Sequence, residues 1–582
     1  MKKILREPLF YLLPLLVLTW FWIIPAKPNV SDVVLTIDRI SSSESFPIST
    51  YKIKNNSEFS VSFNMNIKKN ENAVYRFYPD DCILGIEING NAFPPEKVKK
   101  PCDYDNGTVI DLSEYTHKGL NKIELQIKNY GGLGGFKMEI PYNEFKSFIF
   151  TLLLLLSIAL ILRKFKFRFI AISIILLGIV VRLILYSYIG PMRFSYFDID
   201  GHLQYIQIIS EEKRLPKINE GWSTYHPPLY YVISAVIKNI ADRYDTSITD
   251  RILQQENLLI SFVYVILGVA LILNLFGNSR VAYLAAFVSV LWPGFAIAGP
   301  RINNDSLFCL GALFCMLFAQ RYWCLHKNSD MLLASIGASI ALAGKSNGFV
   351  ILAAWIVIYI FSVIRPLKIG SLQTLFASIF IVVLFIGFSN YRTIVGIFEG
   401  KKIELIGNVR DLDNSLRVNN TLYNYLYFDL QGYMKEPYTS SRDDKNGRQY
   451  FWNYSLKTSL FGEFRLWDSH VGNTFAMALS ILALLIFMFA LWGIIHAKFK
   501  DLPSLLFVIF LFVASICARV SYPYSCTNDF RYIFPVLFPL VYFATRGVQI
   551  LEDYRLKILS YASMLLFAIL SFLFITLPAF LV

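Results

Sequence analysis

The stretch that decides the fold is RKFKFRFIAISIILLGIVVRLILYSYI, residues 163–189. It opens with four cations in six residues, 163–168, and continues as an apolar run from 169 to 189. Another apolar run, from about 147 to 162, precedes the cations. An α-helix needs about 20 apolar residues to cross a bilayer. Short loops rich in Lys and Arg are typical of the cytoplasmic side. The stretch therefore predicts two membrane-spanning helices joined by a tight cytoplasmic turn.

The composition extends this prediction to the whole chain. Of 582 residues, 55% are hydrophobic and 17% charged, against about 25% charged in ordinary soluble domains. A net charge of +13 would suggest a nucleic-acid partner for a soluble protein. Here the cations fall in short loops between apolar runs, which is the topology signal of membrane proteins. We therefore expect an integral membrane protein that binds membrane lipid and no nucleic acid.

Apolar runs recur along the chain and predict about thirteen transmembrane helices, with the N-terminus in the cytoplasm. The run from 229 to 240 is short and follows a Pro-Pro pair, so we expect an interfacial helix there. Counting it as a span would put the cationic loops near 498–500 and 555–557 outside. The predicted spans are 10–24, 147–162, 169–189, 258–276, 281–299, 307–325, 331–345, 348–364, 371–389, 473–495, 503–520, 532–545 and 558–580.

These runs give a predicted domain organisation. The first run ends in aromatic residues without a small-residue cleavage site, which favours an uncleaved anchor over a signal peptide. The expected parts are an anchor helix at 1–25, an extracytoplasmic domain at 26–146, a transmembrane module at 147–389 with outer loops at 190–256 and 300–306, an extracytoplasmic loop at 390–472, and C-terminal transmembrane helices at 473–582.

Residues 26–146 differ from the rest of the chain. Alternating segments such as 33–37, 60–67 and 122–127 are separated by Asn, Gly, Pro and Ser turns, and this pattern predicts an antiparallel β-sandwich. Cys82 and Cys102 are the only cysteines that share a soluble segment, so they form the one plausible disulfide.

Two acidic sites fall on the predicted outer side. Asp198 and Asp200 stand beside His202 in the first outer loop, and Asp305 precedes a span. Acids at the mouth of a helical bundle are costly without a function. They could act as a general base, orient an acceptor, or hold a divalent cation such as Mg or Mn. Helix capping is the alternative for each of the three acids.

Cations and aromatic residues complete the predicted site. Lys345 and Arg531 stand at outer helix ends, where a phosphate would explain them. Snorkelling toward lipid headgroups is the alternative, mainly for Lys345. Tyr532 adjoins Arg531, and Glu463 is a further candidate in the long outer loop.

Five motifs together resemble the GT-C superfamily of membrane glycosyltransferases, in particular the bacterial protein-mannosyltransferase and aminoarabinose-transferase types. The resemblance covers about residues 169–545 and rests on Asp198 to His202, Tyr225-His226-Pro-Pro-Leu-Tyr-Tyr231, Arg301 to Ser306, Gly344-Lys-Ser-Asn-Gly348 and Arg531 to Pro535.

The resemblance implies a donor in which a monosaccharide is linked to polyprenyl phosphate. The acceptor hydroxyl of a glycan, lipid or protein would attack the anomeric carbon with inversion. Asp198 is then the first choice for the base, Asp200 the second, and Asp305 matches the second acidic position.

In the same resemblance Lys345 and Arg531 match positions that contact the donor phosphate, and His202 and His226 would shape the pocket. Tyr225, Tyr532 and Glu463 complete the predicted substrate-binding set. The implied location is a bacterial inner membrane with the active site on the extracytoplasmic face.

Two other classes stay open. One is a transporter or flippase of a lipid-linked or polyanionic glycan, although charged residues within the spans are few and no inverted repeat is evident. The other is a non-catalytic assembly subunit whose β-domain recruits partners. The β-domain precedes the part of the chain that resembles the superfamily, so the resemblance does not account for it.

Overall fold

The computed structural model describes residues 14–581 apart from 17, 21–27, 45–47, 51–52, 55, 68–72, 104–106, 131–133, 142–143, 192–195, 245–248, 365–371, 399–411, 445–446, 464 and 468. The chain divides into two compact units. One unit draws on residues 1–167, 189–193 and 237–253, and the other on 168–188, 194–236 and 254–582.

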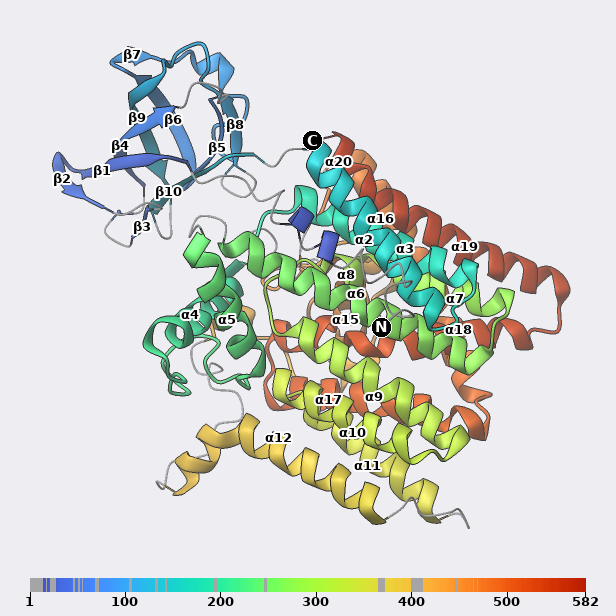
Figure 1. Ribbon diagram of the computed structural model, residues 1–582. Coiled ribbons are helices and arrows are strands. Elements are labelled where there is room, and N and C mark those ends of the chain that lie inside the picture. Colours follow the sequence, from blue (N-terminus) through green and yellow to red (C-terminus); the bar gives the residue numbers. More distant parts are fainter. Residues whose placement is uncertain are drawn as a thin grey trace, which may run out of the picture. The chain divides into compact units, whose positions relative to one another are not determined.

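The first unit contains the predicted antiparallel β-sandwich (Figure 1). One sheet has the order β2-β1-β4-β9-β6-β7 and the other β3-β10-β5-β8. The strands are β1 (Val30–Ile37), β2 (Ile40–Ser43), β3 (Ile48–Thr50), β4 (Ser57–Ile67), β5 (Val74–Pro79), β6 (Cys82–Ile88), β7 (Asn91–Ala92), β8 (Thr108–Asp111), β9 (Gly119–Asn129) and β10 (Gly134–Glu139), with a 3-10 turn η1 (Pro95–Lys97) after β7.

Alternation along the strands builds the core of the sandwich. From Phe59 in β4 and from Asn121 in β9, every second residue is buried, so each strand contributes one face to the core. Phe63 of β4 stacks on Phe136 of β10 with ring centroids 6.0 Å apart, which joins the two sheets. Cys82 and Cys102 form the predicted disulfide.

The remaining elements are helical. They are α2 (Glu144–Lys164), α3 (Phe169–Tyr188), α4 (Tyr196–Glu212), α5 (Leu229–Tyr244), α6 (Thr249–Phe276), α7 (Arg280–Val290), α8 (Pro293–Ile297), α9 (Asp305–Leu325), α10 (Asn328–Gly344), α11 (Gly348–Ile364), α12 (Leu372–Phe398), η4 (Asn414–Leu416), α13 (Leu422–Leu426), α14 (Leu430–Lys435), α15 (Phe451–Phe461), α16 (His470–Ile495), η6 (Phe499–Asp501), α17 (Leu502–Ser521), η7 (Ser525–Asn528), η8 (Phe530–Val536), α18 (Leu537–Ile550), α19 (Tyr554–Thr576) and α20 (Pro578–Leu581).

Within the described residues, nine helical segments are long and apolar enough to cross a membrane, and the chain is an integral membrane protein. They correspond to nine of the predicted spans. Helices α10 and α11 coincide with two further predicted spans, at 17 residues each. The predicted anchor at 10–24 lies outside the described residues except for 14–16 and 18–20. The predicted interfacial run is the helix α5.

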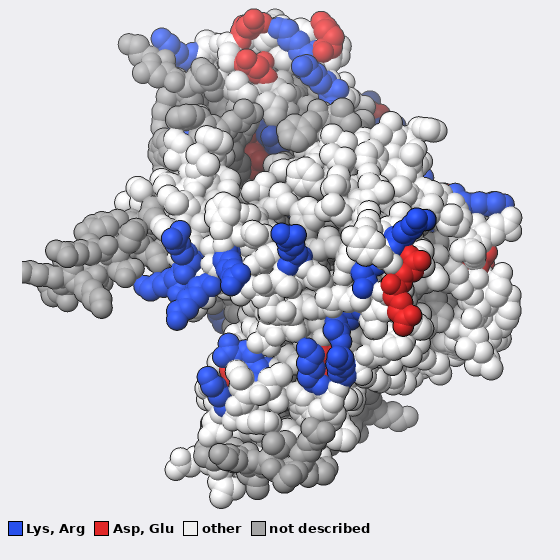
Figure 2. All heavy atoms as spheres, turned by 90° about the vertical axis from the view of Figure 1, so that its right-hand side faces the viewer, with Lys and Arg blue, Asp and Glu red and all other residues white. Residues whose placement is uncertain are grey.

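Cations mark one face of the molecule. The right-hand side of Figure 1, where the turn between α18 and α19 lies, faces the viewer in Figure 2. Lys and Arg side chains gather there on a surface otherwise made largely of uncharged atoms. Short loops rich in Lys and Arg are the feature on which the predicted orientation rests, and the orientation stays a prediction.

Two sequence predictions need correction. The predicted span 281–299 is two helices, α7 and α8, because Pro293 cannot supply the backbone N–H that would continue α7. The predicted loop 390–472 contains the short helices α13 and α14 and the longer helix α15. In α15, ten of eleven residues are buried, so this part of the loop belongs to the protein core.

Arg182 holds the break between α7 and α8. This fully buried residue of α3 donates from Nη1 to the carbonyl of Val290, at 3.3 Å, and from Nη2 to the carbonyl of Phe295, at 3.2 Å. Trp292, between the two helices, donates from Nε1 to the carbonyl of Ser459 in α15, at 2.7 Å. Backbone that leaves the helical pattern at membrane depth is tolerated only where its polar groups find partners.

Replacing Arg182 tests this role. The variant Arg182→Met leaves the Val290 and Phe295 carbonyls unpaired, and each buried acceptor without a donor costs about 1–3 kcal/mol. We expect a lower midpoint of thermal unfolding in detergent. Arg163→Met, at an exposed arginine, is the matched control and should leave the midpoint unchanged. Equal stability of the two variants would contradict the role.

Candidate active site

Close packing of α9 against α10 positions the first pair of predicted residues. A Cβ atom on Gly311 of α9 would lie 2.3 Å from the backbone N of Ala341 in α10, so only glycine allows this approach. Gly337 of α10 is equally close to the backbone of Cys315. Small residues of this kind bring helix backbones together. The start of α9 therefore meets the end of α10.

Asp305 and Lys345 lie at this junction and form a buried ion pair, with side chains 6% and 7% exposed. Asp305 is the first residue of α9, and Asn304 occupies the N-cap position. The capping alternative for Asp305 and the snorkelling alternative for Lys345 are therefore both wrong. A buried charge is tolerated where it is paired, and each residue supplies the other's partner.

A second pair of opposite charges lies next to the first. The backbone N of Arg531 donates to Oδ1 of Asp529 at 3.0 Å, and its Nε lies 3.2 Å from Oδ2. Arg531 also donates from Nη2 to the hydroxyl of Tyr532, at 3.2 Å. The charges of Arg531 and Arg301 both act on Asp305.

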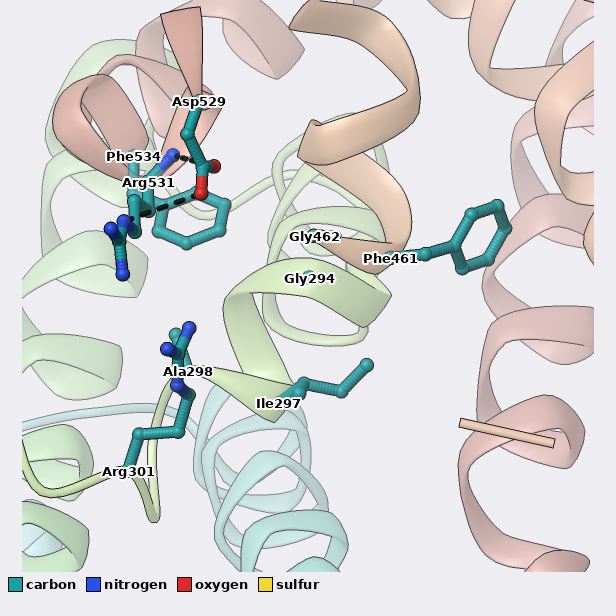
Figure 3. Close-up of a pocket in the computed structure, with 9 residues that line it drawn as sticks. All are labelled: Gly294, Ile297, Ala298, Arg301, Phe461, Gly462, Asp529, Arg531 and Phe534. Carbon is teal, nitrogen blue, oxygen red and sulfur yellow. Dashed lines mark hydrogen bonds and ion pairs between the residues drawn. The ribbon is translucent and has the colours of Figure 1, made fainter. Parts of the chain in front are cut away.

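Arg301, Asp529 and Arg531 line a small cavity with Gly294, Ile297, Ala298, Phe461, Gly462 and Phe534 (Figure 3). The Arg301 and Arg531 side chains reach toward the same space from different segments of the chain. The cavity volume is about 10 Å³, which is about the room that one water molecule needs. A larger anion would enter only if these side chains move.

The predicted histidines belong to an aromatic cluster. Nδ1 of His202 and the hydroxyl of Tyr231 share a hydrogen bond of 2.9 Å, and the ring of His226 stacks on that of His202 at 6.1 Å. Tyr205 stacks on Tyr231 at 3.8 Å. Tyr225 contacts His226, with ring centroids 4.0 Å apart. The motif around His226 and the helix α4 therefore form one structural unit.

The charge of Asp305, a member of the first ion pair, acts on Tyr231 in the aromatic cluster. Burial raises the pKa of Tyr231, and its neighbours Tyr205, Tyr230, Tyr225 and Asp305 raise that pKa further. Asp305 thus lies within electrostatic reach of the aromatic cluster.

The two acids of the first outer loop have different positions. Both lie inside α4, which begins at Tyr196. Neither is an N-cap, so the capping alternative is wrong for them as well. Asp200 is exposed, yet surrounding protein partly desolvates its carboxyl group and raises its pKa. The side chain of Asp198 lies outside the described residues.

Two other predictions concern Glu463 and a metal. Glu463 accepts a hydrogen bond from the hydroxyl of Tyr454 and follows the cavity residue Gly462 directly. No group of three or more His, Cys, Asp or Glu side chains within the described ranges is arranged to hold a metal ion. Asp305, a member of the predicted Mg or Mn set, is paired with Lys345 instead.

Arg392 is a residue that the sequence did not single out. It lies in α12, just beyond the predicted end of a span. Its Nη1 donates to the carbonyl of Pro216 at 3.0 Å, and its Nη2 to that of His226 at 2.6 Å. Its guanidinium also lies 5.4 Å from the ring centroid of Tyr205. Burial raises the pKa of Tyr205 to about 12, against the charge of Arg392.

Arg301 and Asp529 were also missed as site residues, although both stand within or beside quoted motifs. The sequence did contain a signal for them, because Arg301 lies close to Asp305 along the chain and Asp529 lies close to Arg531. Arg392 offered none, because an arginine at the end of a span is ordinarily assigned to topology.

Solved structures that resemble this chain are membrane glycosyl- and oligosaccharyltransferases of the GT-C superfamily. ArnT from Cupriavidus metallidurans, bound to undecaprenyl phosphate, is 14% identical over 68% of this chain and 61% of its own, with a TM-score of 0.40.

Two further structures resemble the chain at similar levels. Archaeal oligosaccharyltransferase AglB from Archaeoglobus fulgidus, in complex with an inhibitory peptide and a dolichol-phosphate, is 13% identical over 71% of this chain and 56% of its own, with a TM-score of 0.40. Arabinosyltransferase EmbB from Mycobacterium smegmatis is 11% identical over 92% of this chain and 52% of its own, with a TM-score of 0.39.

The chain therefore spans between about half and three fifths of the length of these structures. No family model and no curated protein matches it. These neighbours belong to the superfamily whose motifs the sequence resembles.

The Asp305–Lys345 pair predicts strong coupling between its members. Lys345→Met leaves a buried carboxylate without its partner, which typically costs 3–5 kcal/mol. We expect the double variant Asp305→Leu/Lys345→Met to unfold at a higher temperature in detergent than Lys345→Met alone. Additive losses from the two single variants would show that the pair is not coupled.

The hydrogen bonds of Arg392 to the carbonyls of Pro216 and His226 lead to a prediction about the loop that carries His226. Arg392→Ala removes the donors to the carbonyls of that loop, so hydrogen exchange of the amides in 217–226 should become faster. Arg417→Ala, at an exposed arginine, is the control and should leave those amides unchanged. Unchanged exchange in Arg392→Ala would mean that other contacts hold the loop.

Proposed function

We propose that the protein is a glycosyltransferase that moves a monosaccharide from a polyprenyl-phosphate donor to an extracytoplasmic acceptor hydroxyl, with inversion at the anomeric carbon. The observation that carries this proposal is a buried cluster with an excess of positive charge. Within the described part of the chain, three cations, Arg301, Lys345 and Arg531, act on the two carboxylates of Asp305 and Asp529. A buried excess of positive charge favours an anionic ligand, and a phosphate suits it.

The cluster offers two guanidinium groups to that phosphate. Arg301 and Arg531 line the cavity, where Arg531 also pairs with Asp529, whereas Lys345 is not among the lining residues and pairs with Asp305. Planar guanidinium groups bind phosphate oxygens through paired hydrogen bonds, which an ammonium cannot do. In the proposal Arg301 and Arg531 contact the donor phosphate directly. Lys345 acts by holding the Asp305 side chain in place.

The reaction then needs a base for the acceptor hydroxyl. Residues four apart lie on the same face of an α-helix, and residues two apart lie on different faces. His202 faces the buried aromatic cluster, while Asp200 is exposed. Position 198, one turn before His202 in α4, is therefore the better position for the base. The helical repeat therefore favours Asp198 over Asp200 as the base.

The proposed step balances without a cofactor. The base takes the proton of the acceptor hydroxyl, and the acceptor oxygen forms a bond to the anomeric carbon. The bond between that carbon and the phosphate oxygen breaks from the opposite side. Polyprenyl phosphate leaves with the electron pair, and its developing negative charge is stabilised by Arg301 and Arg531.

Separate replacement of the acids tests the proposal. Purified protein in detergent is given a panel of labelled polyprenyl-phosphate monosaccharides and extracted surface glycans, lipids and proteins as acceptors. General-base catalysis contributes about 10²–10⁴-fold, so Asp198→Asn should lower kcat by at least 100-fold. Asp200→Asn should change the rate by only a few fold. Glu211→Gln, at an exposed acid of the same helix, should leave it unchanged.

Transfer that survives in Asp198→Asn, Asp200→Asn and Asp305→Asn alike would overturn the catalytic proposal. The assembly-subunit alternative would then gain. Movement of the donor across vesicles without sugar transfer would instead favour a flippase.

A further inference from the structure

An exposed apolar face lies on the two short helices α13 and α14, far in sequence from the proposed site. Its six large side chains are 38% to 74% exposed. The rings of Tyr423 and Tyr427 stack at 4.7 Å, so the face is ordered. Scattered apolar residues on a surface are ordinary, but six large exposed ones within residues 422–434, two of them stacked on each other, favour contact with another apolar phase. The 422–434 face consists of Leu422, Tyr423, Leu426, Tyr427, Leu430 and Met434.

The segment that leads into this face is fixed to the end of a candidate span. The backbone N of Val418 donates to the carbonyl of Pro523 at 2.9 Å. Nδ2 of Asn420 donates to the carbonyl of Val520, also at 2.9 Å. Helix α17 ends at Ser521. The face therefore begins at the level where a membrane-spanning helix leaves the bilayer.

The C-terminal end of the 422–434 face is attached to α16, at a position further from the end of that helix. The buried Tyr433 of α14 donates from its hydroxyl to the carbonyl of Ser480 in α16, at 3.1 Å. Ser480 comes ten residues after His470, the first residue of α16. At a rise of 1.5 Å per residue, Ser480 lies about 15 Å along the helix.

The length of α16, compared with the thickness of the hydrocarbon core, shows whether Ser480 lies inside the membrane. The 26 residues of α16 give a helix roughly 39 Å long, about 9 Å more than the hydrocarbon core. Even if the whole excess lay at the His470 end, Ser480 would still be about 6 Å inside the core. Helix α14, which packs beside Ser480, must then lie at or below the headgroup level.

We infer that the 422–434 face is inserted into the lipid leaflet at this end of the bundle, with phospholipid acyl chains as its partner. Leucine with tyrosine is the composition of interfacial segments, because tyrosine presents an apolar ring and a polar tip. The exposed Lys435 at the end of α14 can extend its ammonium toward the headgroups. A water-exposed face of this size next to a bilayer would be costly by comparison.

This insertion connects the bilayer to the wall of the cavity. Asp429, between α13 and α14, exchanges two hydrogen bonds with Asn453 of α15, at 2.9 and 2.8 Å. Helix α15 ends at Phe461, which lines the cavity together with Gly462. Lipid contact on the 422–434 face would therefore hold α15 in the position that closes the cavity.

Depth-dependent quenching tests the insertion. The full-length protein, with Cys324, Cys517 and Cys526 replaced by serine, receives Leu426→Cys, is labelled with an environment-sensitive fluorophore and is reconstituted into phosphatidylcholine vesicles. We expect doxyl-labelled phosphatidylcholine to quench the label several-fold more than aqueous iodide does. Leu120→Cys, at a leucine of the β-sandwich that is 57% exposed, is the matched control. It should be quenched by iodide.

Three results would overturn the inference. Equal iodide quenching at both positions would place the face in water. Quenching by neither reagent at position 426 would mean that another protein chain covers the face. Loss of doxyl quenching on addition of equimolar polyprenyl phosphate would mean that the face binds a prenyl chain in place of bulk lipid.

A second variant tests the connection to α15. Leu422→Glu/Leu426→Glu should speed hydrogen exchange of the α15 amides in vesicles, because charged side chains would withdraw the face from the lipid. Leu120→Glu should leave those amides unchanged. If α15 exchanges at the same rate in both variants, the face does not support the cavity wall.

Discussion

The helical bundle depends on one constraint, which is that a break in a membrane-embedded helix must have its backbone groups satisfied. Pro293 ends α7 and starts α8, and Arg182 from α3 supplies the donors that the Val290 and Phe295 carbonyls need. A buried guanidinium is well suited to this position because it carries five donors in a rigid fork. The cost of burying its charge is offset by these bonds and by the rings of Tyr264 and Phe295 beside it.

The break also directs the next segment of the chain into the charged cluster. Helix α8 contributes Gly294 and Ile297 to the cavity, and the turn after it carries Arg301 and leads to Asp305. If α7 continued as one helix over these residues, each residue would lie about 1.5 Å further along the axis of α7 than the one before it, and the side chains would move away from the charged cluster. The turn instead brings them against Arg531 and Lys345. The same irregularity therefore interrupts a span and builds the charged cluster.

The site joins contributions that are remote in sequence and chemically different. The α4–α5 region brings histidines and tyrosines, the α9–α10 junction brings a buried ion pair, and the turn before α18 brings Arg531 and Asp529. Glycines decide how closely α9 and α10 approach, and Arg392 holds the loop that carries His226. Pocket shape in such an arrangement depends on helix packing, so the inferred lipid contact on the 422–434 face would act on the cavity through α15.

The sequence by itself determined the membrane class, the β-sandwich and most of the spans, because length, hydropathy and alternation are local properties of the chain. It also selected Asp305, Lys345 and Arg531, because charges at the ends of apolar runs are conspicuous. Only the tertiary structure decided that Asp305 and Lys345 are each other's partner, that 281–299 is broken, and that α15 is buried. Those facts depend on contacts between residues that are distant in sequence. Examples are the hydrogen bonds donated by the Arg182 guanidinium, the close helix approach that Gly311 allows, and the carbonyls to which Arg392 donates.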